Sequence, residues 1–170
     1  MLSNEFHFLE EWTIPDFSPR EIWSGVVAAD PKTLPRWWRG VYQEVELAGA
    51  EGGLRLGASA RVTARGFLPY RLRFVLEVTD LTPGAMIAVR SRGDLEGIWQ
   101  AKLSGHSSGS HVAIEWRVTV NKPIVRLLSP LLKPIFARNH TWTTPRGEAG
   151  LRAYMNQYAA ASVLGEEQRA

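Results

Sequence analysis

The stretch YRLRFVLEV, residues 70–78, separates apolar from charged side chains with a period of two. The apolar set is Tyr70, Leu72, Phe74, Leu76 and Val78, and the charged set is Arg71, Arg73 and Glu77. The stretch VAIEWRVTV, residues 112–120, repeats this pattern around Trp116. Successive side chains of a β-strand point to opposite faces, so both stretches predict strands with one buried and one wet face.

Turn-forming residues divide the middle of the chain into short segments. Clusters rich in glycine, proline, aspartate or serine lie at residues 49–53, 83–84, 93–94 and 105–109. Such residues favour tight turns, and short connections join antiparallel neighbours. Residues 6–14 add an alternating stretch near the N-terminus. We therefore predict a curved antiparallel sheet of about six or seven strands with one face toward solvent.

Helix signals follow the first predicted strand. Ser18 and Glu21 have the spacing of a capping box, and Pro19 stands at the first helical position. A second short helix or turn is expected at residues 33–39. The first strand is thus followed by two short helices before the remaining strands begin.

A long C-terminal helix is predicted between residues 123 and 161, where apolar residues recur three and four positions apart. It would cover the buried face of the sheet. Pro130, Pro134 and Pro145 each remove a backbone donor, so we expect this helix to be kinked or restarted. Ser129 and Thr144 are the expected N-caps. Together with the sheet, this helix predicts an α+β fold.

The composition indicates one globular domain without disulfide or thiolate chemistry. The chain has 170 residues, is 45% hydrophobic, carries a formal net charge of +3 and contains no cysteine. We expect a single domain, residues 1–170, with a core at about residues 5–160 and a frayed tail at 163–170. The sequence contains neither a signal-like apolar segment nor a run long enough to span a bilayer, which predicts a cytoplasmic protein.

Large aromatic and small aliphatic residues are combined in a way that favours a ligand. The chain has seven Trp, six Phe and four Tyr, more flat apolar surface than packing alone requires. One face of the strand predicted at residues 58–66 carries only Ala58, Ala60, Val62, Ala64 and Gly66. Small side chains under a bent helix would leave an apolar void. Alternatively, tryptophan rings fill the space that alanine leaves.

Five short motifs occur along the chain: LPRWW at residues 34–38, LPY at 68–70, GDLEG at 93–97, NH at 139–140 and GEAGL at 147–151. They resemble motifs of the START-like (SRPBCC) superfamily, in its polyketide cyclase/dehydrase and lipid-transport branch. The resemblance extends from Phe6 to about Tyr158 and implies a helix-grip fold that encloses a ligand between the sheet and the C-terminal helix. Members of this family include aromatase/cyclases and lipid carriers, so the resemblance specifies the fold better than the function.

We expect the ligand to contact ten residues, and we assign no catalytic residue. The ligand-binding set is Trp37, Trp38, Tyr70, Phe74, Trp99, Trp116, Phe136, Asn139, His140 and Trp142. By the resemblance, Trp37 and Trp38 lie at the opening of the cavity; alternatively, they seal one end of the core. No cofactor and no metal site is expected, because His106 and His111 flank a turn that offers no carboxylate ligand.

Acid–base groups on the predicted inner faces are few. Glu10 shares the face of Phe8 and Trp12, and Gln43 shares the face of Val45. A buried carboxyl group among aromatic rings would suit acid–base chemistry. We expect instead that a bulge in the first strand turns Glu10 toward solvent.

Three functions follow from these observations. The first is the binding of a hydrophobic or aromatic small molecule, such as a lipid or a polyketide-like compound, and the second is polyketide cyclase or dehydratase activity in the same cavity. The third is protein interaction through the outer sheet face, where Arg61, Arg65, Arg71, Arg73, Arg90, Arg92 and Arg117 gather. No nucleic acid partner is expected, because stacking aromatics are absent from that face. The predicted assembly is a monomer or a homodimer.

Overall fold

A computed structural model describes residues 5–28, 31–48, 54–65, 71–121 and 129–167, and the side chains of 129–140 and 162–167 are not part of that description. The strands are β1 (Glu5–Pro15), β2 (Tyr42–Ala48), β3 (Ser59–Arg65), β4 (Arg71–Thr82), β5 (Met86–Gly93), β6 (Leu95–His106) and β7 (Gly109–Val120). The helices are α1 (Pro19–Ile22), the π-turn η1 (Trp23–Val27), the 3₁₀ turn η2 (Pro31–Thr33), α2 (Leu34–Trp37) and α4 (Ser129–Glu167).

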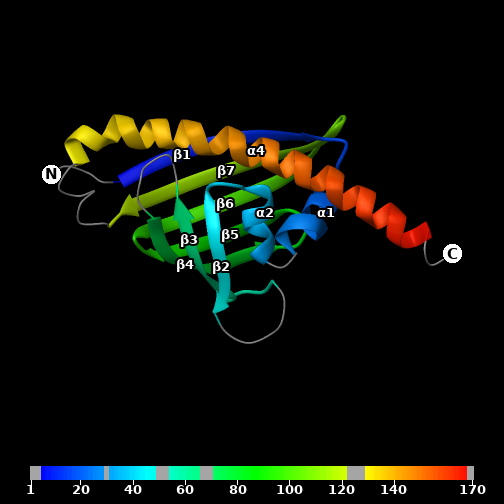
Figure 1. The fold of residues 1–170 in the computed structure, drawn as a ribbon, viewed down its shortest axis with the longest axis horizontal. Helices are drawn as coiled ribbons and strands as arrows, with labels where there is room; N and C mark the ends of the chain where they lie inside the picture. The colour runs from blue at the N-terminus through cyan, green and yellow to red at the C-terminus, as the bar shows by residue number, and fades with distance from the viewer. Residues whose placement is uncertain (1–4, 29–30, 49–53, 66–70, 122–128, 168–170) are drawn as a thin grey trace.

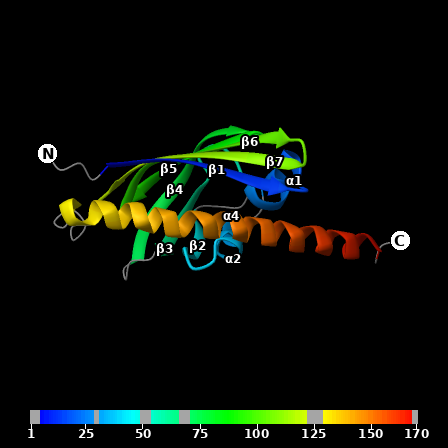
Figure 2. The ribbon, with the colours of Figure 1, turned by 90° about the horizontal axis from the view of Figure 1, so that it is seen from above.

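The seven strands form one antiparallel sheet in the order β1-β7-β6-β5-β4-β3-β2. The sheet curves so that its two edges, β1 and β2, come to opposite sides of α4 (Figure 2). The predicted helix-grip arrangement, an α+β fold with short helices after the first strand, is confirmed. The described part of the chain contains no helix that is both long and apolar enough to cross a membrane.

The capping box before α1 is formed as predicted. The backbone N–H of Glu21 donates to Ser18 Oγ at 3.3 Å, and the backbone N–H of Ser18 donates to Glu21 Oε2 at 2.8 Å. The Ser18 side-chain and backbone hydrogen bonds lower the pKa of Glu21. These bonds satisfy two donors that a helix start leaves open, and they turn the chain from β1 into the helical segment.

The C-terminal helix is one continuous element, so of the two expected outcomes, a kink or a restart at the prolines, the restart does not occur (Figure 1). Pro130 lies in the first turn, where its missing N–H has no intrahelical partner to lose. Near Pro145, two side chains donate to backbone carbonyl groups of the preceding turn. Trp38 Nε1 donates to the Thr143 oxygen at 3.0 Å, and Arg146 Nη1 donates to the Trp142 oxygen at 2.8 Å. Thr144 consequently lies inside α4 and does not cap it.

Two glycines let α4 approach the aromatic residues of the domain closely. A Cβ atom at Gly150 would overlap the carbonyl oxygen of Trp37, and one at Gly147 would come within 2.6 Å of Trp38 and 2.8 Å of Trp12. The GEAGL motif therefore permits backbone contact between α4 and α2, which any larger side chain would prevent.

The free edge of β1 is covered by polar groups of α4. The Thr13 N–H donates to Glu148 Oε1 at 3.2 Å, and Arg152 Nε donates to the Thr13 oxygen at 2.9 Å. A carboxylate and a guanidinium thus satisfy the outward-facing backbone groups of Thr13, which blocks this point of the edge from pairing with other chains.

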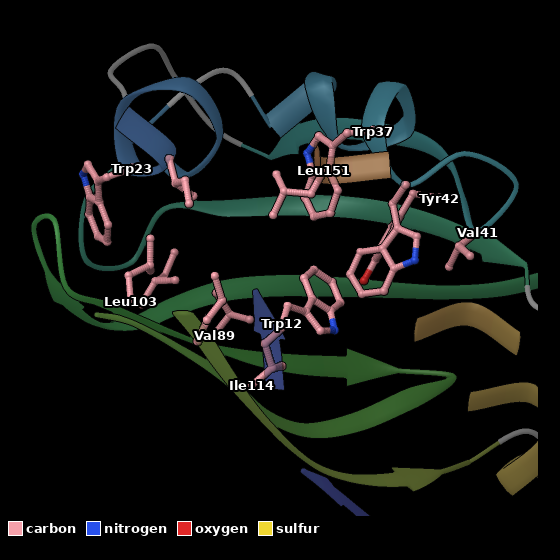
Figure 3. Packing of buried hydrophobic residues seen from close by; sticks show 14 of the residues in the cluster. Trp12, Trp23, Trp37, Val41, Tyr42, Val89, Leu103, Ile114 and Leu151 are labelled. Atoms are coloured by element: carbon pink, nitrogen blue, oxygen red, sulfur yellow. The ribbon is translucent and has the colours of Figure 1, made fainter. Parts of the chain in front are cut away.

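The core fills the concave side of the sheet. Ala60, Val62 and Ala64 of β3 are buried there, in agreement with the small inner face that the alternation predicts. Trp12, Trp37 and Tyr42 gather on this side together with Leu151 of α4 (Figure 3). Large aromatic and small aliphatic side chains therefore share one hydrophobic core.

Candidate functional site

Five tryptophans and one tyrosine form a connected cluster centred on Trp38. Its ring centroid lies 5.4 Å from that of Trp12, 5.3 Å from Trp37, 5.3 Å from Tyr42 and 6.1 Å from Trp116. Trp99 extends the cluster, with its centroid 5.8 Å from that of Trp116. Most of these pairs meet edge to face, a geometry that stabilises aromatic contacts beyond their burial.

The sheet register explains why residues distant in the sequence meet here. Trp99 of β6 lies directly opposite Trp116 of β7, and Trp116 lies opposite Phe8 of β1. Trp37 and Trp38 come from the end of α2, just before β2 begins. Four of the ten expected site residues, Trp37, Trp38, Trp99 and Trp116, are thus brought together.

Of the remaining expected residues, Phe74 and Trp142 belong to the same hydrophobic core, and the others lie outside the description. Phe74 is buried in the core on β4, opposite Val62. Trp142 is half-buried on α4, and the guanidinium carbon of Arg146 lies 3.9 Å from its ring centroid. Tyr70 lies outside the described residues, as do the side chains of Phe136, Asn139 and His140 on α4.

The indole N–H groups of the cluster fall into two sets. Trp12 Nε1 donates to Glu10 Oε2 at 3.1 Å, and Trp38 Nε1 donates to the Thr143 oxygen at 3.0 Å. The Nε1 atoms of Trp37, Trp99 and Trp116 are buried and find no acceptor among the described residues. The hydroxyl of Thr144 on α4 is likewise buried without a partner within that part of the chain. Folded proteins rarely bury unpaired donors, so several in one cluster mark this region as unusual.

Glu10 is buried, which corrects the expectation that a bulge exposes it. The pairing of β1 with β7 runs without a register shift from Glu5 to Pro15, so strict alternation keeps Glu10 on the inner face. It is 7% exposed and lies opposite Ile114. The indole of Trp12, two residues along the same face, supplies a donor to its carboxylate. A carboxylate therefore borders the aromatic cluster.

Tyr42 is a member of the cluster that the sequence pattern did not identify. A bulge between Tyr42 and Glu44 shifts the register of β2, so Tyr42 and Val45 are both buried although they are three positions apart. Gln43, expected on the inner face, is exposed for the same reason. Burial raises the pKa of Tyr42 and the negative charge of Glu10 raises it further, so its hydroxyl stays protonated at neutral pH.

The outer face carries more acidic residues than the arginine row alone indicates. Arg92 pairs with Glu77 at 3.0 Å, Arg117 pairs with Glu115 at 2.7 Å, and Glu46 lies opposite Arg61 in the register of β2 and β3. Interleaved charges of both signs are typical of a solvated sheet face. Among the described residues, no group of three or more His, Asp or Glu side chains is arranged to hold a metal ion.

Comparison with solved structures identifies the class of fold. TTHA0849 from Thermus thermophilus matches with a TM-score of 0.70 at 14% identity, covering 91% of this chain and 98% of that protein. The aromatase/cyclase ZhuI from Streptomyces sp. R1128 matches with a TM-score of 0.70 at 9% identity, covering 91% and 96%. Ara h 8.0201 matches with a TM-score of 0.63 at 15% identity, covering 90% and 99%.

The chain thus shares the helix-grip fold of these three proteins, a curved antiparallel sheet against a long C-terminal helix. No family model matches its sequence, and no curated protein does. At identities this low the likeness extends to the fold alone, so the function must be argued from the residues of the site.

Proposed function

We propose that this chain, as a single START-like domain, binds a hydrophobic or aromatic small molecule, lipid or polyketide-like, between the inner face of the sheet and α4. One observation carries the proposal: Trp37, Trp99 and Trp116 bury indole N–H groups that have no acceptor among the described residues. Tryptophan rings also supply the broad apolar walls that small-molecule sites require. The likeness to ZhuI, an aromatase/cyclase, agrees with such a ligand.

The competing interpretation is that the rings only fill the core. Large rings that share one core with the small residues of β3 would account for the packing, but packing does not account for the unpaired donors. A core tryptophan usually finds a partner for its N–H, as Trp12 and Trp38 do here. Trp99 and Trp116 are also only half-buried, whereas Trp12 is 2% exposed. A bound molecule would explain both features.

Native mass spectrometry of the purified protein, followed by titration with an apolar fluorescent probe, tests this proposal. We expect a bound small molecule or near one-to-one probe binding that quenches tryptophan emission. Trp116→Phe should weaken the binding, whereas Trp23→Phe should not, because Trp23 of η1 belongs to the same core but lies apart from Trp12 and Trp37 (Figure 3). A probe that binds only when the protein begins to unfold would refute the proposal.

A second candidate, a cyclase- or dehydratase-like enzyme, is favoured by the burial of Glu10. A carboxylate that borders a ligand site can move a proton to or from a bound compound. If the chain converts a polyketide-like substrate, Glu10→Gln should slow that reaction by roughly 100-fold or more, the usual effect of losing an acid or base. Unchanged turnover in this variant would exclude Glu10 as the catalyst.

A further inference from the structure

The tryptophans of the cluster differ in what their N–H groups do. Trp12 donates to Glu10 of its own strand, β1, and Trp38 donates to the Thr143 oxygen and so ties the end of α2 to α4. Trp37, Trp99 and Trp116 come from three different elements, α2, β6 and β7, and have no such acceptor in the described structure. The two sets meet at Trp38, whose ring contacts both Trp37 and Trp116.

The three unpaired indole groups, on Trp37, Trp99 and Trp116, are all hydrogen-bond donors. An indole N–H only donates, and it offers no acceptor in return. The complement of several such groups is a molecule with acceptor oxygens, of which a ring carbonyl is the simplest case. A hydrocarbon or an acyl chain would cover the same rings while leaving the donors unpaired, which is costly in a dry site.

We infer that Trp37, Trp99 and Trp116 are specificity-determining residues that hold carbonyl oxygens of a ring-bearing ligand, whereas Trp12 and Trp38 are structural. This inference rests on the proposed function, because it concerns the same site. The three nitrogen atoms are closed to solvent in this structure, so the inference requires that the rings turn when a ligand binds. Trp99 and Trp116 are half-buried, whereas Trp37 is 7% exposed, so the first two are the more accessible members of the set.

Fluorene and 9-fluorenone make a matched pair of probes, because they share a ring skeleton and differ in one carbonyl group. The readout is the set of indole ¹H–¹⁵N signals from protein labelled at tryptophan, each assigned by the signal that a Trp→Phe variant lacks. Subtracting the shifts caused by fluorene from those caused by fluorenone cancels the ring-current effect that the two probes share.

Fluorenone should move the indole protons of at least one of Trp37, Trp99 and Trp116 downfield relative to fluorene and should bind about tenfold more tightly, which is ~1.4 kcal/mol. The signals of Trp12 and Trp38 should show no such difference, since their donors are already engaged. In Trp99→Phe and Trp116→Phe the preference for fluorenone should shrink, and in the control Trp23→Phe it should remain.

The possible results distinguish failure of the carbonyl inference from failure of the proposed function. Equal affinities and equal shifts for the two probes would overturn the inference and leave the proposed function standing. A carbonyl-dependent shift confined to Trp12 or Trp38 would also overturn it. If neither probe binds and no small molecule accompanies the purified protein, the proposed function fails and the inference fails with it.

Discussion

Glu10 and Tyr42 are the polar residues that the fold brings against the tryptophan cluster. Burial of a carboxylate is costly unless hydrogen bonds compensate it, and the Trp12 indole is one such donor. Tyr42 is affected in turn, because its own burial and the nearby charge of Glu10 both oppose ionisation of its hydroxyl. The two residues are therefore electrostatically coupled, and the coupling can be measured through stability.

We predict that Tyr42 makes the protein lose stability in alkaline solution. Its pKa is raised in the folded state, so its contribution is fully present below the ordinary tyrosine pKa of roughly 10 and declines as the pH rises above that value. Urea unfolding between pH 8 and pH 11 should give a shallower decline for Tyr42→Phe than for the wild type. Tyr158→Phe controls for loss of an exposed tyrosine hydroxyl. Equal slopes for Tyr42→Phe and the wild type would contradict the prediction.

The sequence predicted the position of a residue correctly where that position follows from the local pattern alone. Alternation correctly placed Trp99 and Trp116 on the inner face, and the Ser18 capping box formed as expected. Tyr42 was missed because a bulge changes the period of β2, and a bulge has no signature in these residues. The burial of Glu10 depends on its Trp12 partner and on an unbroken register with β7, which are tertiary facts.

At the scale of elements, α4 is one continuous helix, whereas the sequence left open a kink or a restart at its prolines. Proline removes one intrahelical donor, but tertiary contacts decide whether the helix then breaks. Here Trp38 and Arg146 supply donors near Pro145, and Arg152 ties the next turns to β1. Gly147 and Gly150 allow the approach that makes these bonds reachable.

We predict that Gly150→Ala destabilises the protein, against the usual trend for helices. On an exposed helix this change would stabilise by about 1 kcal/mol, because alanine is the better helix former. Here the added Cβ would overlap the Trp37 carbonyl oxygen, so overpacking should cost about 1–3 kcal/mol in urea unfolding. Ala149→Gly, in the same turn but exposed, should lose only about 1 kcal/mol by helix propensity. A stabilised Gly150→Ala would mean that α4 does not press against α2.

The whole molecule is a curved sheet closed by a single helix, and the candidate site lies where the two meet. β6, β7 and β1 contribute Trp99, Trp116 and Trp12 to the aromatic cluster, and the end of α2 contributes Trp37 and Trp38. Because α4 bonds to both β1 and α2, a ligand held beneath it would link elements from both ends of the chain. Such a ligand should stabilise the domain as a unit.

We predict that 9-fluorenone at about 100 times its Kd raises the free energy of unfolding by about 2.7 kcal/mol, the linkage expected for one site on the folded state. Hydrogen exchange should slow in β6, β7 and α4 together, since these elements surround the tryptophan cluster. The arginine-rich outer face provides the matched control. Arg90→Gln, on the exposed side of β5, should leave the stabilisation unchanged, whereas Trp116→Phe should reduce it. If Arg90→Gln abolishes the stabilisation and Trp116→Phe does not, the ligand binds the outer face of the sheet.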